Sequence, residues 1–404
     1  MKGSESRIIQ LLIKPVRLKQ LLVIFVFSYL CAGCGSNGDS TETDKSDFDV
    51  PSGEPINLGT GTSDDLFDPG SIIDVNIQMA AADFSKLRTE GRTLASASSE
   101  CLEDYEFTEF VASVTIDGVA ISNVEIRKKG FLGSISRVRP SLKLDFNTFV
   151  DDRTYNDMSR MTLNNDRQDP SHTHQCMAYD MFRKAGLAAP RCNLARVTVN
   201  GEPLGIYTNV ENIKKPFLER HFGNKSGNLY EAQFADFGVY TNDKFEKKTN
   251  KSENDRTDLA EVSSALALDD ENLIASLGQL IDINEFIRYW ALETLIGHWD
   301  SATGNANNYY IYKNPDDGLF HYIPWGTDAA FTGVNIFKPD SGPLYRSINI
   351  ASRLYAIDQY KTQYHNALNE LIASHWNEQA LLAEVDRIEQ LTATPESAYT
   401  NMRI

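Results

Sequence analysis

The sequence predicts an α+β fold in which a sheet-rich amino-terminal part precedes a helical carboxy-terminal part. Segments that alternate apolar and polar residues, the pattern of half-buried strands, dominate up to about residue 212. From about residue 253 onward, apolar residues recur at helical spacing instead. The 404 residues, 41% hydrophobic and 10% aromatic, suffice for one large domain or for two lobes with a real core.

The predicted strands come in a short series joined by turns. Residues 72–79 alternate like a strand, and residues 81–88 are helix-like. Residues 109–130 and 139–147 predict further strands, the former folded around an Ile-Asp-Gly turn. Residues 195–212 predict a hairpin whose turn is an Asn-Gly pair.

Basic residues accompany a glycine-containing loop between these strands. In the stretch "RKKGFLGSISR", backbone N–H groups could approach an anion that Arg127, Lys128 or Lys129 neutralises. The alternative is a plain turn, which is the commoner role of a Lys-Gly pair between strands. Lys143 lies on the strand face opposite Leu142, so it can project across a cleft from a rigid element.

The remaining elements are mostly helical. Residues 163–190 predict a loop and then a helix, capped near Asp169 or Ser171. Residues 282–297 predict a helix that starts with a capping box and presents an apolar stripe. Residues 350–394 predict the helices that close the second lobe.

The amino terminus has the pattern of an export signal. Basic residues precede the apolar run 21–30, which is too short for a membrane-spanning helix of roughly 20 residues. The run leads into "LCAGC", as at the cleavage site of bacterial lipoproteins, although Cys31 stands where Leu is usual. We predict a signal peptide over 1–33 and lipidation of Cys34, so that the protein is anchored in the cell envelope and faces the periplasm or exterior. An ordinary secretory signal is the alternative.

The segment after Cys34 is predicted to be a disordered tether over residues 34–70. It carries nine acidic residues and one basic residue between Gly35 and Gly70, with little apolar content. The folded domain then covers residues 71–404, with a sheet-rich lobe over about 71–212 and a helical lobe over about 213–404. The formal net charge of −17 repels phosphate backbones, so we expect no nucleic-acid partner.

Cysteines and histidines leave two questions open. In an oxidising compartment, Cys101, Cys176 and Cys192 allow at most one internal disulfide, and the sequence does not select the pair. His172 and His174 stand close to Cys176, but the spacing matches no common zinc pattern. We therefore interpret that stretch as a helix start rather than a metal site.

The strongest functional signal lies in "HWDSATGNANNYYIYKNPDDGLFHYIPWGTDAAF". A helix delivers Asp300 to a loop, an Asn cluster follows, and a predicted hairpin returns to Asp328. Protein kinases supply a catalytic Asp, a magnesium-binding Asn and a magnesium-binding Asp in this order. Phosphate transfer needs oxygen ligands for Mg²⁺ at one end of a rigid hairpin and a carboxylate that orients or deprotonates the attacking group. Asn305 follows Asp300 at the kinase spacing.

Over residues 72 to 331 the chain resembles the CotH kinase family, the atypical protein kinases named after a spore coat protein. The matching pieces are "VEIRKKG", "PSLKLDF", "MTLNNDRQDPS", "YDMFRKAGLAAPRCNLARVTVNGEPLGIYTNVEN", "GNLYEA", "FIRYWALETLIGHWDS", "NNYYIYK" and "FHYIPWGTDAAF". The resemblance implies a two-lobed, kinase-like fold that binds ATP and Mg²⁺ and phosphorylates Ser or Thr of secreted proteins. The expected partner is thus an acceptor protein in the cell envelope or outside.

Carried over by position, the resemblance assigns roles to individual residues. Asp300 is similar to the catalytic Asp, and Asn308 to the metal-binding Asn before the "YxxY" strand. Lys143 is similar to the nucleotide-contacting Lys, while Arg127 and Glu211 occupy family positions in the amino-terminal loop and after the second hairpin. Asp328 is the remaining candidate metal ligand, and Lys129 a further phosphate-binding candidate.

Two departures from the family pattern and one open choice matter. Many members have Pro-Trp-Asp-x-Asp where this chain has Gly326 before Asp328, so one of two carboxylates is missing. Glu231 stands where a Lys is frequent after Tyr. Asn305, Asn307 and Asn308 all remain metal-ligand candidates, with Asn308 first on alignment and Asn305 second on kinase spacing. The alternative function is therefore a catalytically silent pseudokinase that acts as a surface binding or scaffold protein.

Overall fold

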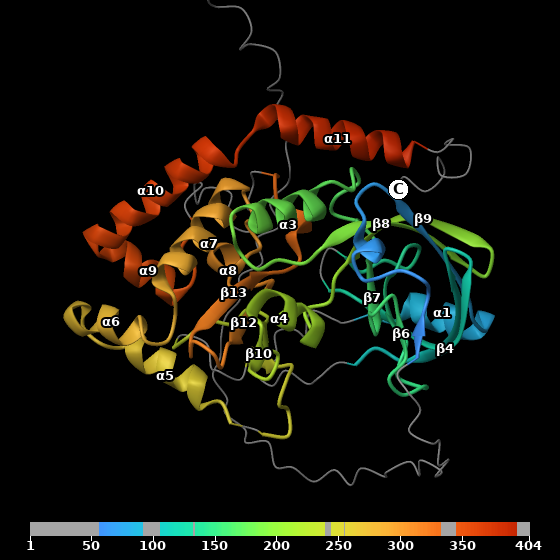
Figure 1. Ribbon diagram of the computed structural model, residues 1–404, viewed down its shortest axis with the longest axis horizontal. Helices are drawn as coiled ribbons and strands as arrows, with labels where there is room; N and C mark the ends of the chain where they lie inside the picture. The colour runs from blue at the N-terminus through green and yellow to red at the C-terminus, as the bar shows by residue number, and fades with distance from the viewer. Residues whose placement is uncertain are drawn as a thin grey trace, which may run out of the picture. The chain divides into compact units, whose positions relative to one another are not determined.

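Seven strands of the amino-terminal part close into a barrel because their apolar faces all turn inward (Figure 1). The computed structural model describes residues 56–91, 106–131, 134–238, 244–253, 255–332 and 345–393. The barrel strands are β2 (Ile72–Gln78), β3 (Phe110–Ile116), β4 (Val119–Lys129), β5 (Ser141–Asp145), β7 (Arg160–Asn164), β8 (Cys192–Val199) and β9 (Glu202–Val210). Their order is β2-β3-β4-β5-β7-β9-β8, and β8 returns to pair in parallel with β2.

The barrel interior is an apolar core. Val75, Ile116, Leu144 and Val197 are among its fully buried residues. The predicted Asn-Gly turn joins β8 to β9, with Asn200 at φ 51° and its glycine neighbour at φ 80°. Helix α1 (Ala81–Thr89) packs against β4.

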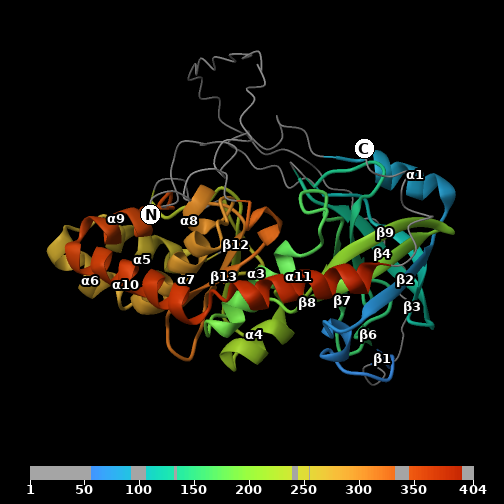
Figure 2. The same ribbon diagram turned by 90° about the horizontal axis from the view of Figure 1, so that it is seen from above.

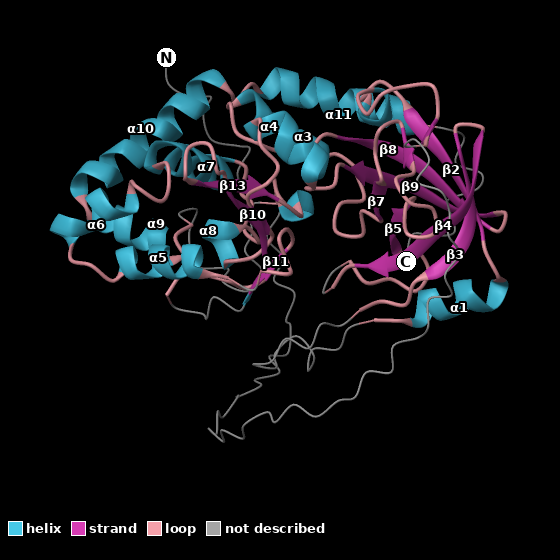
Figure 3. Ribbon diagram, turned by 60° about the horizontal axis from the view of Figure 1, so that its bottom comes forward, coloured by secondary structure: helices cyan, strands magenta, loops and turns pink. Residues whose placement is uncertain are grey.

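The second part combines a four-stranded antiparallel sheet with most of the helices. The sheet order is β11 (Phe245–Lys247), β10 (Asn228–Ala232), β12 (Tyr309–Lys313) and β13 (Phe320–Pro324). The helices are α3 (His174–Lys184), α4 (Lys215–Phe222), α5 (Thr257–Leu266), α6 (Asp270–Leu277), α7 (Ile283–Leu295), α8 (Ala302–Asn305), α9 (Asn349–Ala356), α10 (Asp358–Ser374) and α11 (Glu378–Thr392). Figure 3 shows the barrel strands gathered on one side and helices α5, α6, α7, α9 and α10 on the other.

Each face of the small sheet is covered by a helix. On one face, Phe217 of α4 packs in a cluster with Tyr312 and Ile323. On the other face, the ring of Phe286 on α7 lies 4.8 Å from that of Tyr322. Helix α7 starts as predicted, since the side chain of its N-cap residue Asp282 accepts hydrogen bonds from two backbone N–H groups of the first turn. These contacts fix the hairpin β12–β13 relative to the end of α7.

The predicted α+β class and the order of a sheet-rich part before a helical part are thus confirmed. Helix α11 follows α10 and reaches toward the barrel strands (Figure 2). No helix in the described ranges is long and apolar enough to cross a membrane. The predicted signal peptide, Cys34 and Cys101 lie outside the described residues.

The predicted disordered tether over 34–70 is wrong for its last part, residues 56–70. β1 (Asn57–Leu58) pairs in parallel with β6 (Thr154–Tyr155), and a short 3-10 helix, η1 (Asp65–Phe67), follows. Leu66 is only 2% exposed and joins the barrel core. The acidic composition of the whole segment concealed these few apolar residues, which are enough to attach its end to the barrel.

A disulfide joins Cys176 of α3 to Cys192 of β8. Cys176 therefore cannot bind a metal as a thiolate, which agrees with our preference for a helix start over a metal site. The N-cap residue of α3 is Thr173 rather than the predicted Asp169 or Ser171, although Asp169 Oδ2 accepts a hydrogen bond of 2.7 Å from the backbone N–H of His174. The disulfide thus holds α3 beside the barrel from its first turn.

Candidate functional site

The loop that carries Asp300 is held in place by hydrogen bonds to a buried carboxylate. Glu293 on α7 is fully buried, and its Oε2 accepts hydrogen bonds from the backbone N–H of Thr303 at 2.9 Å and from its hydroxyl at 2.6 Å. Gly304 lies so close to the chain that a Cβ there would meet the Trp299 carbonyl oxygen at 2.2 Å. The backbone of this loop is therefore held in place by contacts that do not involve the Asp300 side chain.

Three asparagine side chains converge on Asp300. Asn305 and Asn307 donate to its Oδ1 at 3.0 and 3.2 Å, and Asn308 donates to its Oδ2 at 2.8 Å. Burial raises the pKa of the Asp300 carboxyl, while these amide donors oppose the rise. The sequence left the three asparagines as rival metal ligands, and the structure gives all three a shared role in orienting Asp300.

Asp328 follows β13 at the open end of the hairpin, in the short 3-10 helix η3 (Thr327–Ala329). Its Oδ2 accepts a 2.8 Å hydrogen bond from Gln168 Nε2, and its carbonyl oxygen lies 3.0 Å from Nδ1 of His174. Burial raises the pKa of Asp328 to about 6, and the nearby negative charge of Asp300 adds to the rise. The two carboxylates therefore interact unfavourably when both are ionised.

Gly326 is packed tightly against the side chain of Asn308. Both have positive φ, 52° and 51°. A Cβ at 326 would lie 2.9 Å from both Cγ and Oδ1 of Asn308. The space that a carboxylate would need at 326 is thus filled by the Asn308 amide, which Asp300 holds in place. His298 is buried beside this contact, with its Nε2 3.3 Å from the Gly326 carbonyl oxygen.

We expect Gly326→Asp to damage the site rather than to restore a lost ligand, and Gly326→Ala to report the same crowding. The positive φ alone costs about 1–2 kcal/mol for a residue with a Cβ. Gly318, in the turn of the same hairpin, has φ 72° but nothing within 4 Å of the position that a Cβ would take. Thermal unfolding should therefore show a larger loss of stability for Gly326→Ala than for the matched Gly318→Ala. Equal losses would remove the packing argument.

Cationic side chains share the barrel face from which Lys129 interacts with Asp328. Arg127 and Lys143 are direct cross-strand partners on β4 and β5, and Lys129 is two residues along the same face. Burial together with the Arg127 charge lowers the pKa of Lys143 to about 7. Burial lowers the pKa of Lys129 to about 8, against the attraction of Asp328 and Glu231. The Lys129 ammonium also lies 5.5 Å from the centre of the Trp325 ring.

Lys128 does not take part in this cluster. Strand alternation turns it to the other face, where it is buried and donates to the carbonyl oxygens of Arg88 and Glu90 at the carboxy-terminal end of α1. Of the three basic residues that the loop offered, Arg127 is held by ion pairs with Glu125 and Glu109. Lys129 is therefore the loop cation nearest to the acids.

A network that the sequence did not assign supports Lys129. Its ammonium donates to Asn164, whose amide donates to Gln175 at 2.6 Å, and Gln175 donates to the buried Asp166 at 3.2 Å. His172 closes the network through a 2.7 Å contact with Asp166. The dense polar run "LNNDRQDPSHTHQ" was the available signal, but only the fold shows which of its members face the acids.

The ion pairs of Glu211 are with residues outside the cluster of Lys129 and Lys143. It is fully buried at the end of β9, where its carboxylate pairs with Arg191 at 2.8 Å and with Arg220. Burial alone would raise the pKa of Glu211, but these two guanidinium groups outweigh it and lower the pKa. Its carboxylate is thus engaged by arginines rather than by Lys143, and its environment is that of a structural ion pair.

The donor set fits a magnesium ion. Asp328 offers a carboxylate, and the Asn308 amide gives its nitrogen to Asp300, which leaves its Oδ1 as an oxygen ligand. The described ranges contain no group of three or more His, Cys, Asp and Glu side chains arranged for a metal. Mg²⁺ accepts such a sparse set because it keeps several waters and takes further ligands from substrate phosphates.

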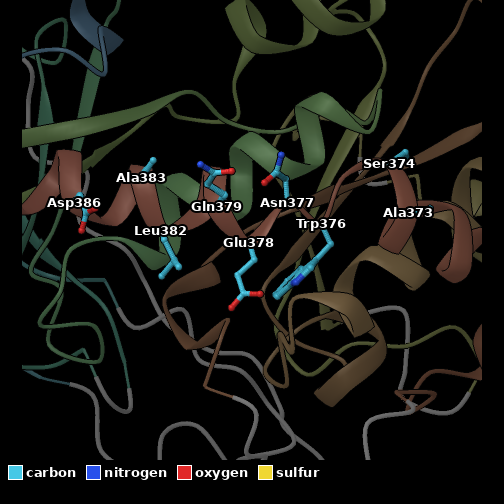
Figure 4. A pocket seen from close by; sticks show the side chains of 9 residues that line it. All are labelled: Ala373, Ser374, Trp376, Asn377, Glu378, Gln379, Leu382, Ala383 and Asp386. Carbon is cyan, nitrogen blue, oxygen red and sulfur yellow. The ribbon is translucent and has the colours of Figure 1, made fainter.

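A large groove lies elsewhere, at the junction of α10 and α11. It encloses about 820 Å³ and is lined by Trp376, Glu378 and Leu382 among others. Figure 4 shows these three side chains on the same side of the junction. The Trp376 ring lies 6.5 Å from that of Phe331, which in turn lies 5.9 Å from the His174 ring. The groove contains neither acid, so we locate the chemistry at the convergence of Asp300, Asp328 and the lysines.

The chain is similar in sequence to several known proteins. A family model described as CotH kinase protein matches residues 126–401, more than half of the chain. The chain is 22% identical to inner spore coat protein H of Bacillus subtilis over 273 residues, 63% of this chain and 74% of that protein. It is 27% identical to spore coat protein homolog 1 of Rhizopus delemar over 182 residues, 42% of this chain and 29% of that protein.

Among solved structures, the chain is similar to the proinflammatory kinase CtkA of Helicobacter pylori. The sequence identity is 10%, and the match covers 62% of this chain and 90% of CtkA. The TM-score is 0.28.

Proposed function

Because this chain belongs to the CotH kinase protein family, we propose that it transfers phosphate from Mg-ATP to Ser or Thr hydroxyls of an extracytoplasmic protein. The observation that carries the proposal is the convergence of Asp300 and Asp328 at one end of the hairpin β12–β13. Lys129 interacts with Asp328 from the barrel, and Lys143 lies on the same barrel face. Two mutually repelling acids facing buried lysines fit a site for a metal-bound polyphosphate.

In the proposed reaction, the lysines bind the phosphates and the acids divide the remaining work. Asp328 and Asn308 would hold Mg²⁺, which would supply positive charge beside the transferred phosphate. Asp300 orients the acceptor hydroxyl and takes its proton as the new O–P bond forms. The bond between the β- and γ-phosphates breaks, and ADP leaves. The asparagines and Glu293 keep Asp300 in one orientation throughout, which limits reorganisation during the step.

The direct test is transfer of labelled γ-phosphate from Mg-ATP to the protein itself or to a Ser-rich acceptor. We expect incorporation that requires a divalent metal and is acid-stable, as phosphoserine and phosphothreonine are. A folded protein that binds no Mg-ATP under any condition would refute the proposal. That result would favour a catalytically silent scaffold, the function that the absence of a carboxylate at 326 suggests.

Lys143 should make nucleotide binding depend on pH. Its pKa is about 7 in the free protein, and bound phosphate must raise it. Below pH 7 the Lys143 ammonium is charged in both the free and the ATP-bound protein. Above pH 7 binding must take up a proton, so the affinity for ATP falls by up to about tenfold per pH unit. Lys143→Arg keeps its charge throughout, and its affinity relative to wild type should rise above pH 7. Calorimetric titration with ATP at several pH values checks this, and parallel profiles would contradict it.

We also propose that the mature protein starts at Cys34 and is held on a membrane by lipid. The support is the pattern "LCAGC" after a short apolar run. Each buried methylene of an acyl chain contributes about 0.8 kcal/mol, so more than one chain gives firm attachment. Cys34→Ser should release the protein from the membrane fraction, as immunoblotting after fractionation would show. Mass spectrometry that finds an unlipidated start elsewhere would exclude the anchor.

A further inference from the structure

Glu231 places a carboxylate inside the cationic cluster. It lies on β10, directly opposite Tyr310 of β12 and Glu246 of β11. Its Oε2 lies 2.6 Å from Nζ of Lys248, and its side chain is only 18% exposed. The Tyr310 hydroxyl also hydrogen-bonds to it. The carboxylate of Glu231 is thus held where its charge acts on the barrel lysines Lys129 and Lys143.

Several lysines are influenced by this one carboxylate. Lys129, Lys143 and Lys214 each have a pKa that burial lowers and that Glu231 raises. Burial would raise the pKa of Glu231 itself, but Lys248 and then Lys143 outweigh it and lower the pKa. Glu231 therefore stays ionised and acts as the counter-ion of the cluster. Any phosphate that binds Lys143 must share this space with a fixed negative charge.

We propose that Glu231 is a specificity-determining residue that makes the site discriminate against metal-free polyphosphate and in favour of the metal-complexed nucleotide. This inference rests on the proposed function, and it adds the charge state of the ligand that the site selects. A fixed carboxylate repels a ligand in proportion to the ligand's charge. Free ATP and tripolyphosphate carry more negative charge than Mg-ATP does, so Glu231 penalises them more.

Glu231→Gln is the first test, because it removes the charge and keeps the size. Binding of tripolyphosphate and of ATP in EDTA should tighten by about tenfold or more, whereas Mg-ATP should tighten by about threefold or less. Titrations at pH 6 and at pH 7 are compared, because Lys143, with a pKa of about 7, is mostly charged at pH 6, whereas Asp328, with a pKa of about 6, is mostly ionised at pH 7. Adenosine, which has no phosphate, should bind both proteins equally. Equal tightening for the metal-free and metal-bound ligands would overturn the inference.

Glu246 provides a matched control. It lies at the same 2.6 Å from the Lys248 ammonium, but its side chain is 40% exposed, on the edge strand β11. Glu246→Gln should change the affinity for tripolyphosphate by less than about twofold, because water screens its charge. If Glu246→Gln and Glu231→Gln tighten tripolyphosphate binding equally, the effect comes from freeing Lys248 rather than from the position of Glu231, and the inference fails.

A second variant guards against loss of folding and gives the opposite sign. Lys248→Met leaves the Glu231 charge less compensated, so tripolyphosphate binding should weaken by about threefold or more while Mg-ATP binding changes less. Wild type that binds tripolyphosphate but no Mg-ATP would refute the proposed function. Wild type and Glu231→Gln that both fail to bind tripolyphosphate would overturn this inference, whether or not Mg-ATP binds.

Discussion

Asp300→Asn is expected to lower phosphate transfer by about 10²- to 10⁴-fold while Mg-ATP binding changes little. The substitution removes the carboxylate that takes the acceptor proton but keeps the size of the side chain. The asparagine donors lose their ionised acceptor, but Asn308 keeps its 3.0 Å hydrogen bond to the backbone carbonyl oxygen of Asp300, which holds its amide in place. Single-turnover transfer and a separate nucleotide titration measure the two quantities independently.

The control for Asp300 lies at the other end of the same hairpin. Asp317 accepts a 2.8 Å hydrogen bond from the Leu319 backbone N–H in the turn between β12 and β13. Asp317→Asn should leave transfer unchanged if the loss depends on position rather than on removing a carboxylate from the hairpin. A folded Asp300→Asn protein with wild-type transfer would rule out Asp300 as the base.

Asp328→Asn is expected to abolish metal-dependent nucleotide binding. A unit charge about 4 Å from a cation in an effective dielectric of about 20 is worth about 4 kcal/mol, so the affinity for Mg²⁺ should fall about 10³-fold. Asp328 also meets Gln168 through its carboxylate, and the neutral amide preserves that contact in one orientation. Titration of Mg²⁺ or Mn²⁺ in the presence of ATP measures the loss.

The two variants separate the two acids. Asp300→Asn should retain metal-dependent ATP binding without transfer, and Asp328→Asn should lack both. The reverse pattern, with metal binding lost only in Asp300→Asn, would exchange the roles that we propose. Indistinguishable variants, both like wild type, would leave the hairpin without a catalytic function.

The central hairpin could be predicted because its signal is local. Asp300 and Asp328 are separated by one hairpin, so spacing and turn residues suffice to bring them together. The barrel strands other than β7 and the helix at 283–295 were likewise predictable from periodicity and capping. These features depend on residues that are neighbours in the sequence.

Other features depend on contacts between distant segments, and the sequence could not supply them. Lys128 and Lys129 are adjacent and chemically alike, yet they point to opposite faces of β4. Lys128 donates to a carbonyl oxygen of α1, whereas Lys129 interacts with Asp328. Gln168 meets Asp328 across 160 positions of the chain. Glu211 occupies a family position, but two arginines from other elements determine its environment.

The disulfide between Cys176 and Cys192 bears on how the protein is prepared. It closes a loop with a sequence separation of 16 residues, for which loop entropy predicts about 3 kcal/mol of stabilisation. Helix α3, which it tethers, begins with His174 and Gln175, the residues that reach Asp328 and the Lys129 network. Material produced in a reducing cytoplasm or purified with dithiothreitol lacks this tether. Assays of such material describe a protein in which His174 and Gln175 are less firmly placed than in the oxidised form.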